Sequence, residues 1–390
     1  MSKIRKLKNI KNIVITAGGT GGHIYPGLAI AKELIQRGYL ISWIGSEVGL
    51  EKKLVPEAGI GIESDFLKIA GVRNKSLLGW IQLPFKLMRA VLQARKILKN
   101  KKADLVISFG GFASGPAGLA AKSLGVPLFI HEQNAILGMT NFYLAKMAAR
   151  IFSAFPINHF KSEVIGNPIR ADILEIVRSK FVDGMDFVSP LAGETDPKRV
   201  CVEGQRGGKR EGPLKILITG GSQGSLIFNT LIPEALSKIK NPMNIHHQAG
   251  PKTLEIAQEN YKNFMKNNSG HEIQVVPYFS EIVQEYQWAD LIICRSGALT
   301  VSEVAAVGLP AIFIPHPNVV DDHQRMNAEW LSEQGAGICL IQKDLTAEKL
   351  AQVIQDLSND RKLLDSMGQK AKALAKKEAV SLLCNAVDAM

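Results

Sequence analysis

The chain contains 390 residues, of which 46% are hydrophobic, and it carries a formal net charge of +11. This length and apolar content suffice for two or three domains with full-sized cores. The four cysteines form no Cys-x-x-Cys pair, which argues against a disulfide framework or a zinc site and favours a reducing compartment. The basic N-terminus lacks the apolar core of a signal peptide, and no segment has the length and hydropathy of a transmembrane helix. We therefore expect a soluble protein that is at most peripherally membrane-bound.

Short β-branched runs alternate with helical patterns along the chain, and this alternation predicts an α/β fold of doubly wound parallel sheets. Strands are expected at 12–18, 40–45, 104–111 and 127–134 in the first half, and at 215–224, 272–278, 291–297 and 311–316 in the second. Both IVITAGGTGG and ILITGGSQGS are a strand followed by a glycine loop and a helix, so the two halves indicate a duplicated domain type. Residues 179–212, rich in Gly, Pro and charge, are expected to be a linker or insertion.

Positive charge is concentrated in two places. Residues 1–11 carry five Lys or Arg and residues 66–103 carry ten more, with no Asp or Glu in either. In the second stretch the cations alternate with bulky apolar residues; we assign a membrane-docking patch to Trp80, Ile81, Phe85, Lys86, Leu87 and Arg89. A basic segment with Trp and Phe is typical of docking on an anionic membrane surface, although the solvated face of a core helix explains part of it. Nucleic acid is disfavoured as a partner, because no nucleic-acid-binding motif accompanies the charge.

Glycine-rich loops follow three of the expected strands, at 18–23, 110–116 and 220–225. None fits the dinucleotide fingerprint G-x-G-x-x-G, which disfavours an NAD-dependent oxidoreductase, and no GxxxxGK[ST] P-loop is present. Tight turns alone can explain one such loop. Three loops on two similar, facing domains instead predict a cleft that holds two diphosphate-bearing ligands.

His23 lies where the first helix is expected to begin. The helix dipole there disfavours the imidazolium form, so the ring is expected to be neutral near pH 7 and able to accept a proton. His23 is therefore a candidate general base toward a substrate hydroxyl. The alternative is a histidine that only satisfies backbone groups.

Glu303 and two arginines are further candidates. Thr300 and Glu303 match a helix capping box, but a carboxylate at this place can also accept both hydroxyls of a ribose. No D-x-D sequence offers an acidic clamp for a metal–diphosphate complex. Helix N-termini with Arg170 or Arg295 would then meet diphosphate charge, unless these arginines are ordinary surface residues.

Several ordered motifs together resemble the MurG family of glycosyltransferases. They are AGGTGGHIYPGLAIAKEL, GGFASGP, HEQNAILGMTN, GNPIR, GGSQGS, WADLIICRSGALTVSEVAAVGLPAIFIPHP and DDHQRMNA. The resemblance spans residues 10 to about 375, apart from the 179–212 insertion. It implies a GT-B fold of two Rossmann-like domains facing across a deep cleft, and an inverting transfer without metal or cofactor. The implied donor is UDP-GlcNAc, and the acceptor is the 4-hydroxyl of MurNAc-pentapeptide-diphosphoryl-undecaprenol (lipid I), which gives lipid II and UDP in peptidoglycan synthesis.

The resemblance also implies a domain plan and a location. Residues 1–167 would form the acceptor and membrane domain, 168–213 the junction, 214–370 the UDP-GlcNAc domain, and 371–390 a helix that returns to the first domain. The protein is expected at the cytoplasmic face of the cell's inner membrane, where cell-wall synthesis and division proteins are further expected partners.

Site residues are carried over from the family motifs. The implied donor-binding residues are Thr20, Gly21, Gly22, Asn134, Arg170, Ser222, Phe279, Ala298, Leu299, Thr300, Val301, Ser302, Glu303 and Gln324. Ser222 is implied at the diphosphate, Phe279 at uracil through backbone groups, and Glu303 at the ribose. Gln324 would reach the GlcNAc hydroxyls. His23 is the implied base toward the acceptor, and Glu132 is the second candidate.

Two departures from the family pattern stand out. Phe112 occupies a position where tyrosine is frequent, and the 179–212 insertion is longer than the usual hinge. Two other functions remain open from the sequence: a GT-B transferase with another lipid or sugar acceptor, and a non-catalytic, membrane-docked nucleotide-binding module.

Overall fold

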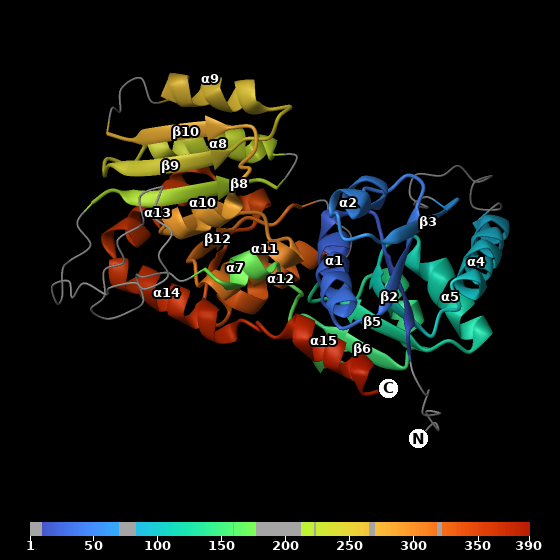
Figure 1. The fold of residues 1–390 in the computed structure, drawn as a ribbon. Helices are drawn as coiled ribbons and strands as arrows, with labels where there is room; N and C mark the ends of the chain where they lie inside the picture. Colours follow the sequence, from blue (N-terminus) through green and yellow to red (C-terminus); the bar gives the residue numbers. More distant parts are fainter. Residues whose placement is uncertain are drawn as a thin grey trace, which may run out of the picture.

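The computed structural model describes residues 10–69, 83–158, 160–176, 212–221, 224–264, 270–317 and 322–390. These residues form two α/β domains, one on each side of the molecule (Figure 1), which we call the N-domain and the C-domain. The predicted pair of doubly wound domains with parallel sheets is confirmed.

The N-domain contains a seven-stranded sheet with the order β3-β2-β1-β4-β5-β6-β7, all parallel. Its strands are β1 (Asn12–Ala17), β2 (Leu40–Ser46), β3 (Glu63–Leu67), β4 (Leu105–Gly110), β5 (Leu128–Glu132), β6 (Arg150–Ser153) and β7 (Glu163–Val164). The order runs outward from β1 in both directions, so a topological switch point lies between β1 and β4. In such sheets, ligands bind beyond the carboxyl ends of the strands at this point.

Helices cover both faces of the N-domain sheet. They are α1 (Gly21–Gln36), α2 (Glu51–Glu57), α4 (Leu83–Asn100), α5 (Ser114–Leu124) and α6 (Met139–Ala145). Ile13 and Ile15 of β1 pack with α1, while Val14 between them packs with α4 and α5 on the opposite face. Both faces are buried, so the strands are continuously hydrophobic rather than alternating.

The C-domain repeats this plan with a six-stranded parallel sheet of order β10-β9-β8-β11-β12-β13. Its strands are β8 (Leu214–Thr219), β9 (Met243–Gln248), β10 (Glu272–Val276), β11 (Leu291–Cys294), β12 (Ala311–Phe313) and β13 (Ile338–Cys339). Its helices are α8 (Leu226–Ser237), α9 (Leu254–Phe264), α10 (Ile282–Trp288), α11 (Ala298–Val307), α12 (His323–Ser332), α13 (Ala347–Asn359) and α14 (Arg361–Leu374), with a 3-10 turn at Gln342–Asp344. The short α7 (Ala171–Leu174) at the junction packs against α11.

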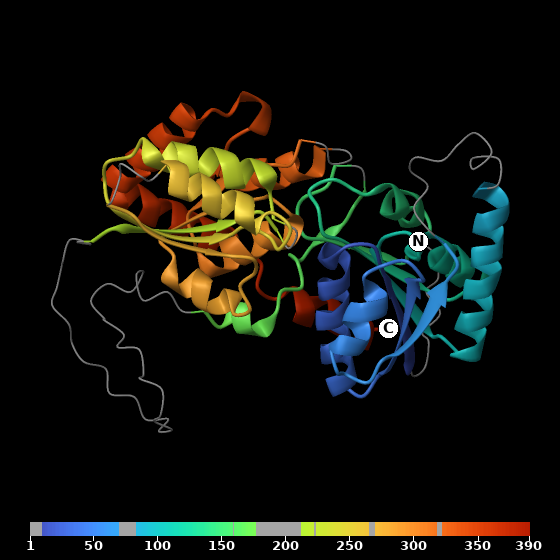
Figure 2. The same cartoon turned by 90° about the horizontal axis from the view of Figure 1, so that it is seen from above.

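The last helix, α15 (Ala379–Asp388), lies against the N-domain (Figures 1 and 2). Its apolar residues join the core beside α1, and Arg37 donates hydrogen bonds to Asn385 and Asp388 at 2.8 and 2.6 Å. The chain therefore crosses between the domains near residues 165–170 and again near 375–378. Within the described parts, no helix is both long and apolar enough to span a bilayer.

Candidate functional site

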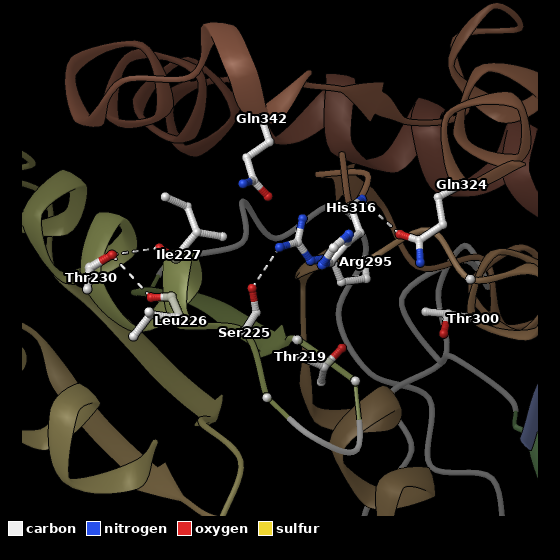
Figure 3. A pocket seen from close by; sticks show the side chains of 14 residues that line it. Thr219, Ser225, Leu226, Ile227, Thr230, Arg295, Thr300, His316, Gln324 and Gln342 are labelled. Carbon is white, nitrogen blue, oxygen red and sulfur yellow. Dashed lines mark hydrogen bonds between the residues drawn. The ribbon is translucent and has the colours of Figure 1, made fainter. Parts of the chain in front are cut away.

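A cavity with a volume of about 680 Å³ lies in the C-domain at the expected donor loop (Figure 3). It is formed where β8 and β11 end and α8 and α11 begin. Its lining residues are Thr219, Gly220, Gly221, Gly224, Ser225, Leu226, Ile227, Thr230, Arg295, Gly297, Thr300, His316, Gln324 and Gln342.

Local backbone conformation shapes this cavity. Gly224 has φ +76°, and a Cβ there would lie 2.0 Å from the carbonyl oxygen of Ala249, so only glycine fits. The N-termini of α8 and α11 both contribute to the lining, through Ser225 and Gly297. Unpaired N–H groups and helix dipoles make this a favourable place for an anion. The predicted diphosphate contact Ser222 lies outside the described residues.

Arg295 brings a positive charge to the cavity. Its guanidinium donates to the carbonyl oxygens of Ile314 and Pro315 at 2.9 and 3.0 Å and to Ser225 Oγ at 2.8 Å. Burial lowers the pKa of Arg295 to about 10, which still leaves it charged at neutral pH. A positive charge held only by neutral acceptors in the described chain is suited to an anionic ligand.

Gln324 lies on the opposite side of the opening from Ser225, as Figure 3 shows, and its Oε1 accepts a hydrogen bond from the His316 backbone at 2.9 Å. Thr300 lines the same cavity. The capping-box interpretation of Thr300 and Glu303 is wrong: α11 begins at Ala298 with Gly297 as its N-cap, so both side chains are already inside the helix. Both are thus available to face the cavities at the helix start.

A second, smaller cavity of about 110 Å³ lies between the domains. It is lined by Tyr25, Pro168, Ile169, Arg170, Tyr278, Leu299 and Glu303. Burial raises the pKa of Glu303 to about 7, while the hydrogen bond from Tyr286 and the charge of Arg170 oppose the shift. Arg170 itself pairs with Asp172 in the described structure, and this pairing raises its pKa.

The remaining predicted residues of the C-domain differ in which of their groups, side chain or backbone, a ligand can reach. Val301 is fully buried in the core and Ala298 nearly so, so these two could meet a ligand only through backbone groups. Ser302 accepts a hydrogen bond from Asn167 at 2.9 Å. The Phe279 backbone N–H donates to Gln248 Oε1 at 3.1 Å, which leaves the Phe279 carbonyl for a base. Leu299 lines the smaller cavity.

In the N-domain, the two predicted glycine loops pack backbone against backbone. Gly18 N donates to Gly110 O at 3.3 Å. Gly111 has φ +90°, and a Cβ there would lie 2.2 Å from Gly18 O, so a side chain would force the loops apart. Phe112, at the departure noted above, is 43% exposed at the end of this loop.

His23 lies in the first turn of α1, as predicted, with Thr20 as the exposed N-cap and Gly21 and Gly22 as the first helical residues. Its pKa is lowered to about 4, mainly by burial; the charge of Glu51 raises it and His323 lowers it further. The expected neutral imidazole is thus supported, but burial is the main reason. Nδ1 is buried without a partner in the described structure, which leaves Nε2 to meet a substrate.

Glu132, the second candidate base, is buried at the end of β5 and holds a loop. Its Oε1 accepts from the Asn134 backbone and side chain at 3.0 and 3.2 Å. Its Oε2 accepts from Gly138 N at 3.1 Å and from Asn141 Nδ2 at 2.9 Å. Four donors on one carboxylate favour a positioning role for Glu132.

Two buried asparagines that we did not single out from the sequence connect the domains. Asn327 of α12 accepts from Ala135 N at 2.8 Å and donates to Asn134 Oδ1 at 3.2 Å. Asn167 donates to Gln133 O in the N-domain and to Ala298 O in the C-domain, at 3.1 and 3.3 Å. Both lie inside quoted motifs, DDHQRMNA and GNPIR, which was the only sequence signal for them.

The predicted membrane patch is partly described. Trp80 and Ile81 lie outside the described residues. On α4, Phe85 is 77% exposed, with exposed Lys86 and Arg89 beside it, but Leu87 is half-buried. The helix instead exposes Met88 and Leu92, which share one face with Phe85 at helical spacing. Among the described residues, no cluster of three or more His, Cys, Asp or Glu side chains suitable for a metal ion was found.

Family models match both domains. Residues 13–153 match the glycosyltransferase family 28 N-terminal domain, and residues 215–383 match the C-terminal domain of the same family. A protein of Shewanella piezotolerans is 42% identical over 369 residues, covering 94% of this chain and 93% of its own. A protein of Vibrio atlanticus is 40% identical over 384 residues, covering 98% and 99%. Both are named UDP-N-acetylglucosamine--N-acetylmuramyl-(pentapeptide) pyrophosphoryl-undecaprenol N-acetylglucosamine transferase.

Solved structures agree with these matches. The crystal structure of Acinetobacter baumannii MurG has a TM-score of 0.79 and 36% identity, covering 97% of this chain and all of the other. The calicheamicin glycosyltransferase CalG4, at 14% identity and a TM-score of 0.63, shares the fold. The expected glycosyltransferase architecture of two facing domains is thereby confirmed.

Proposed function

The chain belongs to glycosyltransferase family 28 and is a glycosyltransferase, and from this premise we propose that it transfers N-acetylglucosamine from UDP-N-acetylglucosamine to the muramyl 4-hydroxyl of lipid I. The products are UDP and lipid II, the disaccharide-linked precursor of peptidoglycan. The observation that carries the proposal is the 680 Å³ cavity, whose two helix N-termini and Arg295 suit a diphosphate.

The donor occupies the C-domain side. Its diphosphate lies along the glycine loop that contains Ser222, against the N-terminus of α8 and Arg295. Gln324 and Thr300 line the same cavity. Their amide and hydroxyl groups form hydrogen bonds with the GlcNAc hydroxyls, as donors or as acceptors.

The nucleoside occupies the smaller cavity between the domains. The Glu303 carboxylate accepts both ribose hydroxyls, and uracil meets the backbone carbonyl of Phe279. Arg170 lines this cavity and reaches the donor from the junction. Thr20, Gly21, Gly22 and Asn134 approach the sugar from the N-domain.

The transfer is a direct displacement with inversion. The acceptor 4-hydroxyl oxygen forms a bond to C1 of GlcNAc, its proton passes to His23 Nε2, and UDP departs with the electrons of the broken C1–O bond. The α8 N-terminus and Arg295 stabilise the negative charge that develops on UDP. His23 is the proposed base, and Glu132 positions Asn134 through two hydrogen bonds.

The acceptor reaches the site from an anionic membrane surface on which α4 docks. Phe85, Met88 and Leu92 enter the interface, and Lys86 and Arg89 meet the lipid headgroups. We place the enzyme at the cytoplasmic face of the membrane, where proteins of cell-wall synthesis and division are expected partners.

The proposal is tested by measuring UDP release from UDP-N-acetylglucosamine, with and without a short-chain lipid I analogue, in buffer with chelator. Release that depends on the acceptor supports the reaction, the donor and independence from metal together. Donor binding without release, in the presence of the analogue, would instead indicate another acceptor or a non-catalytic module.

A further inference from the structure

A buried carboxylate that the proposed reaction does not use lies beneath the first glycine loop. Glu51, the first residue of α2, is fully buried. Its Oε1 accepts from Ser46 N at 2.6 Å and Ser46 Oγ at 2.8 Å, and its Oε2 accepts from Gly19 N at 3.0 Å. All three of these donors are neutral. Because a buried charge is costly, a carboxylate that has no cationic partner among the described residues calls for an explanation.

The surrounding backbone is built around this side chain. A Cβ at Gly18, Gly45 or Gly49 would lie 2.4, 2.5 or 2.0 Å from Glu51 atoms. Gly19, whose N–H reaches Glu51, has φ +93°. The loop is thus confined between Glu51 on one side and Gly110 and Gly111 on the other. It leads directly into α1, which carries His23 in its first turn.

We propose that Glu51 is a positioning residue for transfer: its carboxylate holds the Gly18–Gly19 loop and so places His23, and its negative charge stabilises the imidazolium formed when His23 takes the acceptor proton. In acyl-transfer enzymes a buried carboxylate is hydrogen-bonded to the histidine base and stabilises its imidazolium form. Here Glu51 bonds to the loop before the histidine, so its charge acts on His23 without a direct hydrogen bond. This inference rests on the proposed base role of His23.

Electrostatics around His23 agree with this assignment. The groups whose charges act on the ring are Glu51 from α2, which raises the pKa of His23, and His323 from α12, which lowers it. Among the described residues, Glu51 is therefore an anionic group that offsets part of the cost of protonating this half-buried imidazole.

The experiment is a double-mutant cycle on kcat with Glu51→Gln and His23→Ala, using a soluble lipid I analogue. Glu51→Gln keeps the side-chain volume but removes the charge, so kcat should fall roughly 20-fold, while UDP affinity changes less than about threefold. If Glu51 acts through His23, adding Glu51→Gln to His23→Ala should lower kcat by less than about threefold more. Multiplying effects would overturn the proposal.

Ser46→Ala is the matched control, because it removes one contact to Glu51 but keeps the charge and both backbone donors. It should leave kcat within about threefold of wild type, even where it lowers the melting temperature. An equal loss of kcat in Ser46→Ala and Glu51→Gln would reduce Glu51 to a structural residue. Should Glu51→Gln fail to fold, Glu51→Asp serves in the same cycle, since it keeps the charge but withdraws it by one methylene.

The outcomes separate this inference from the proposed function. Wild-type enzyme without acceptor-dependent UDP release would refute the function. Loss of activity in His23→Ala together with full activity in Glu51→Gln would refute the role of Glu51 alone.

Discussion

The fold shifts the pKa values of His23 and Glu303, two side chains of the proposed site, in opposite directions. Burial lowers the pKa of His23 to about 4 and raises that of Glu303 to about 7. In both cases removal from water disfavours the charged form. The imidazole of His23 therefore binds a proton more weakly than it would in water, and the carboxylate of Glu303 binds one more tightly. The two groups therefore titrate in separate pH ranges, which allows each role to be tested by itself.

The first prediction concerns His23 as the base. His23→Ala should lower kcat by about 10²- to 10⁴-fold, with little change in UDP affinity. In the wild type, kcat/KM for the lipid I analogue at saturating donor should stay level from pH 8 to about 5.5. It should fall only as the pH approaches about 4, where His23 becomes protonated. Steady-state kinetics across this range provide the check, and equal losses of kcat and UDP affinity in His23→Ala would remove it from the base role.

A second prediction concerns Glu303 as the acceptor for ribose hydroxyls. The ionised carboxylate binds them, so uridine affinity should fall as the pH drops through about 7, by roughly eightfold between pH 7.5 and 6. Uridine is the ligand to titrate calorimetrically, because it carries no titrating phosphate. Glu303→Gln should bind uridine more weakly and without this pH dependence; a Gln variant that keeps the wild-type dependence would exclude Glu303 as its source.

At the scale of elements, α4 divides its surface between core and solvent. Ala90, Ala94 and Leu98 are buried, and the last two belong to the core that the sheet forms with α4 and α5. Phe85, Met88 and Leu92 form an exposed apolar stripe. Exposed Lys86, Arg89 and Lys96 accompany the stripe. An apolar stripe of this kind on a basic helix suits a membrane interface better than water.

The third prediction replaces this stripe. Phe85→Ser, Met88→Ser and Leu92→Ser together should weaken binding to vesicles containing anionic lipid by at least about 100-fold, since each side chain contributes roughly 1.5–3 kcal/mol on burial. UDP affinity should not change. Leu363→Ser, which alters an exposed leucine of the C-domain, is the matched control and should bind vesicles like the wild type. Cosedimentation is the measurement, and unchanged binding of the triple variant would place the docking surface elsewhere.

At the scale of the whole molecule, buried amide side chains form hydrogen bonds between the two domains. Asn327 and Asn167 both bridge the loop at 133–135 to the C-domain, and both are buried. Asn327 also donates to Ser296 O at 3.2 Å, so its amide satisfies partners on both sides at once. The hydrogen bond from Asn327 to Asn134 links α12, which also carries the donor-site residue Gln324, to the N-domain.

Asn327→Asp tests this coupling. The new carboxylate would face the oxygens of Asn134 and Ser296, so we expect a loss of roughly 2–4 kcal/mol in unfolding free energy and a more open molecule. Small-angle scattering should then show a larger radius of gyration than the wild type. Asn241→Asp is the control, because Asn241 is only half-buried and its side chain donates to Asn359 in an exposed hydrogen bond. A variant as compact and stable as wild type would show that the amide bridge does not hold the domains.

The strand–glycine loop–helix units, the duplicated domain plan and the place of His23 at a helix start were predictable from the sequence, because β-branched runs, glycines and helix-start signals act over a few residues. The sequence does not predict β9, because its residues MNIHHQ are mostly polar. The segment is a strand because it pairs with β8 and β10, and because the buried His247 Nδ1 shares a hydrogen bond of 2.9 Å with the Tyr261 hydroxyl. The sequence predicts the exposed face of α4 only in part, because Leu87 is half-buried whereas the neighbouring Met88 is exposed.

The sequence by itself determined most of the strands, glycine loops and helix starts and, through its ordered motifs, the family. Only the tertiary structure decided which parts meet: Glu51 beneath Gly19, Asn327 against Asn134 across 193 residues of chain, and the burial that sets the pKa of His23. Hydrogen bonds, close packing and desolvation depend on distances in space, and these are fixed by the packing of whole sheets and helices rather than by neighbours along the chain.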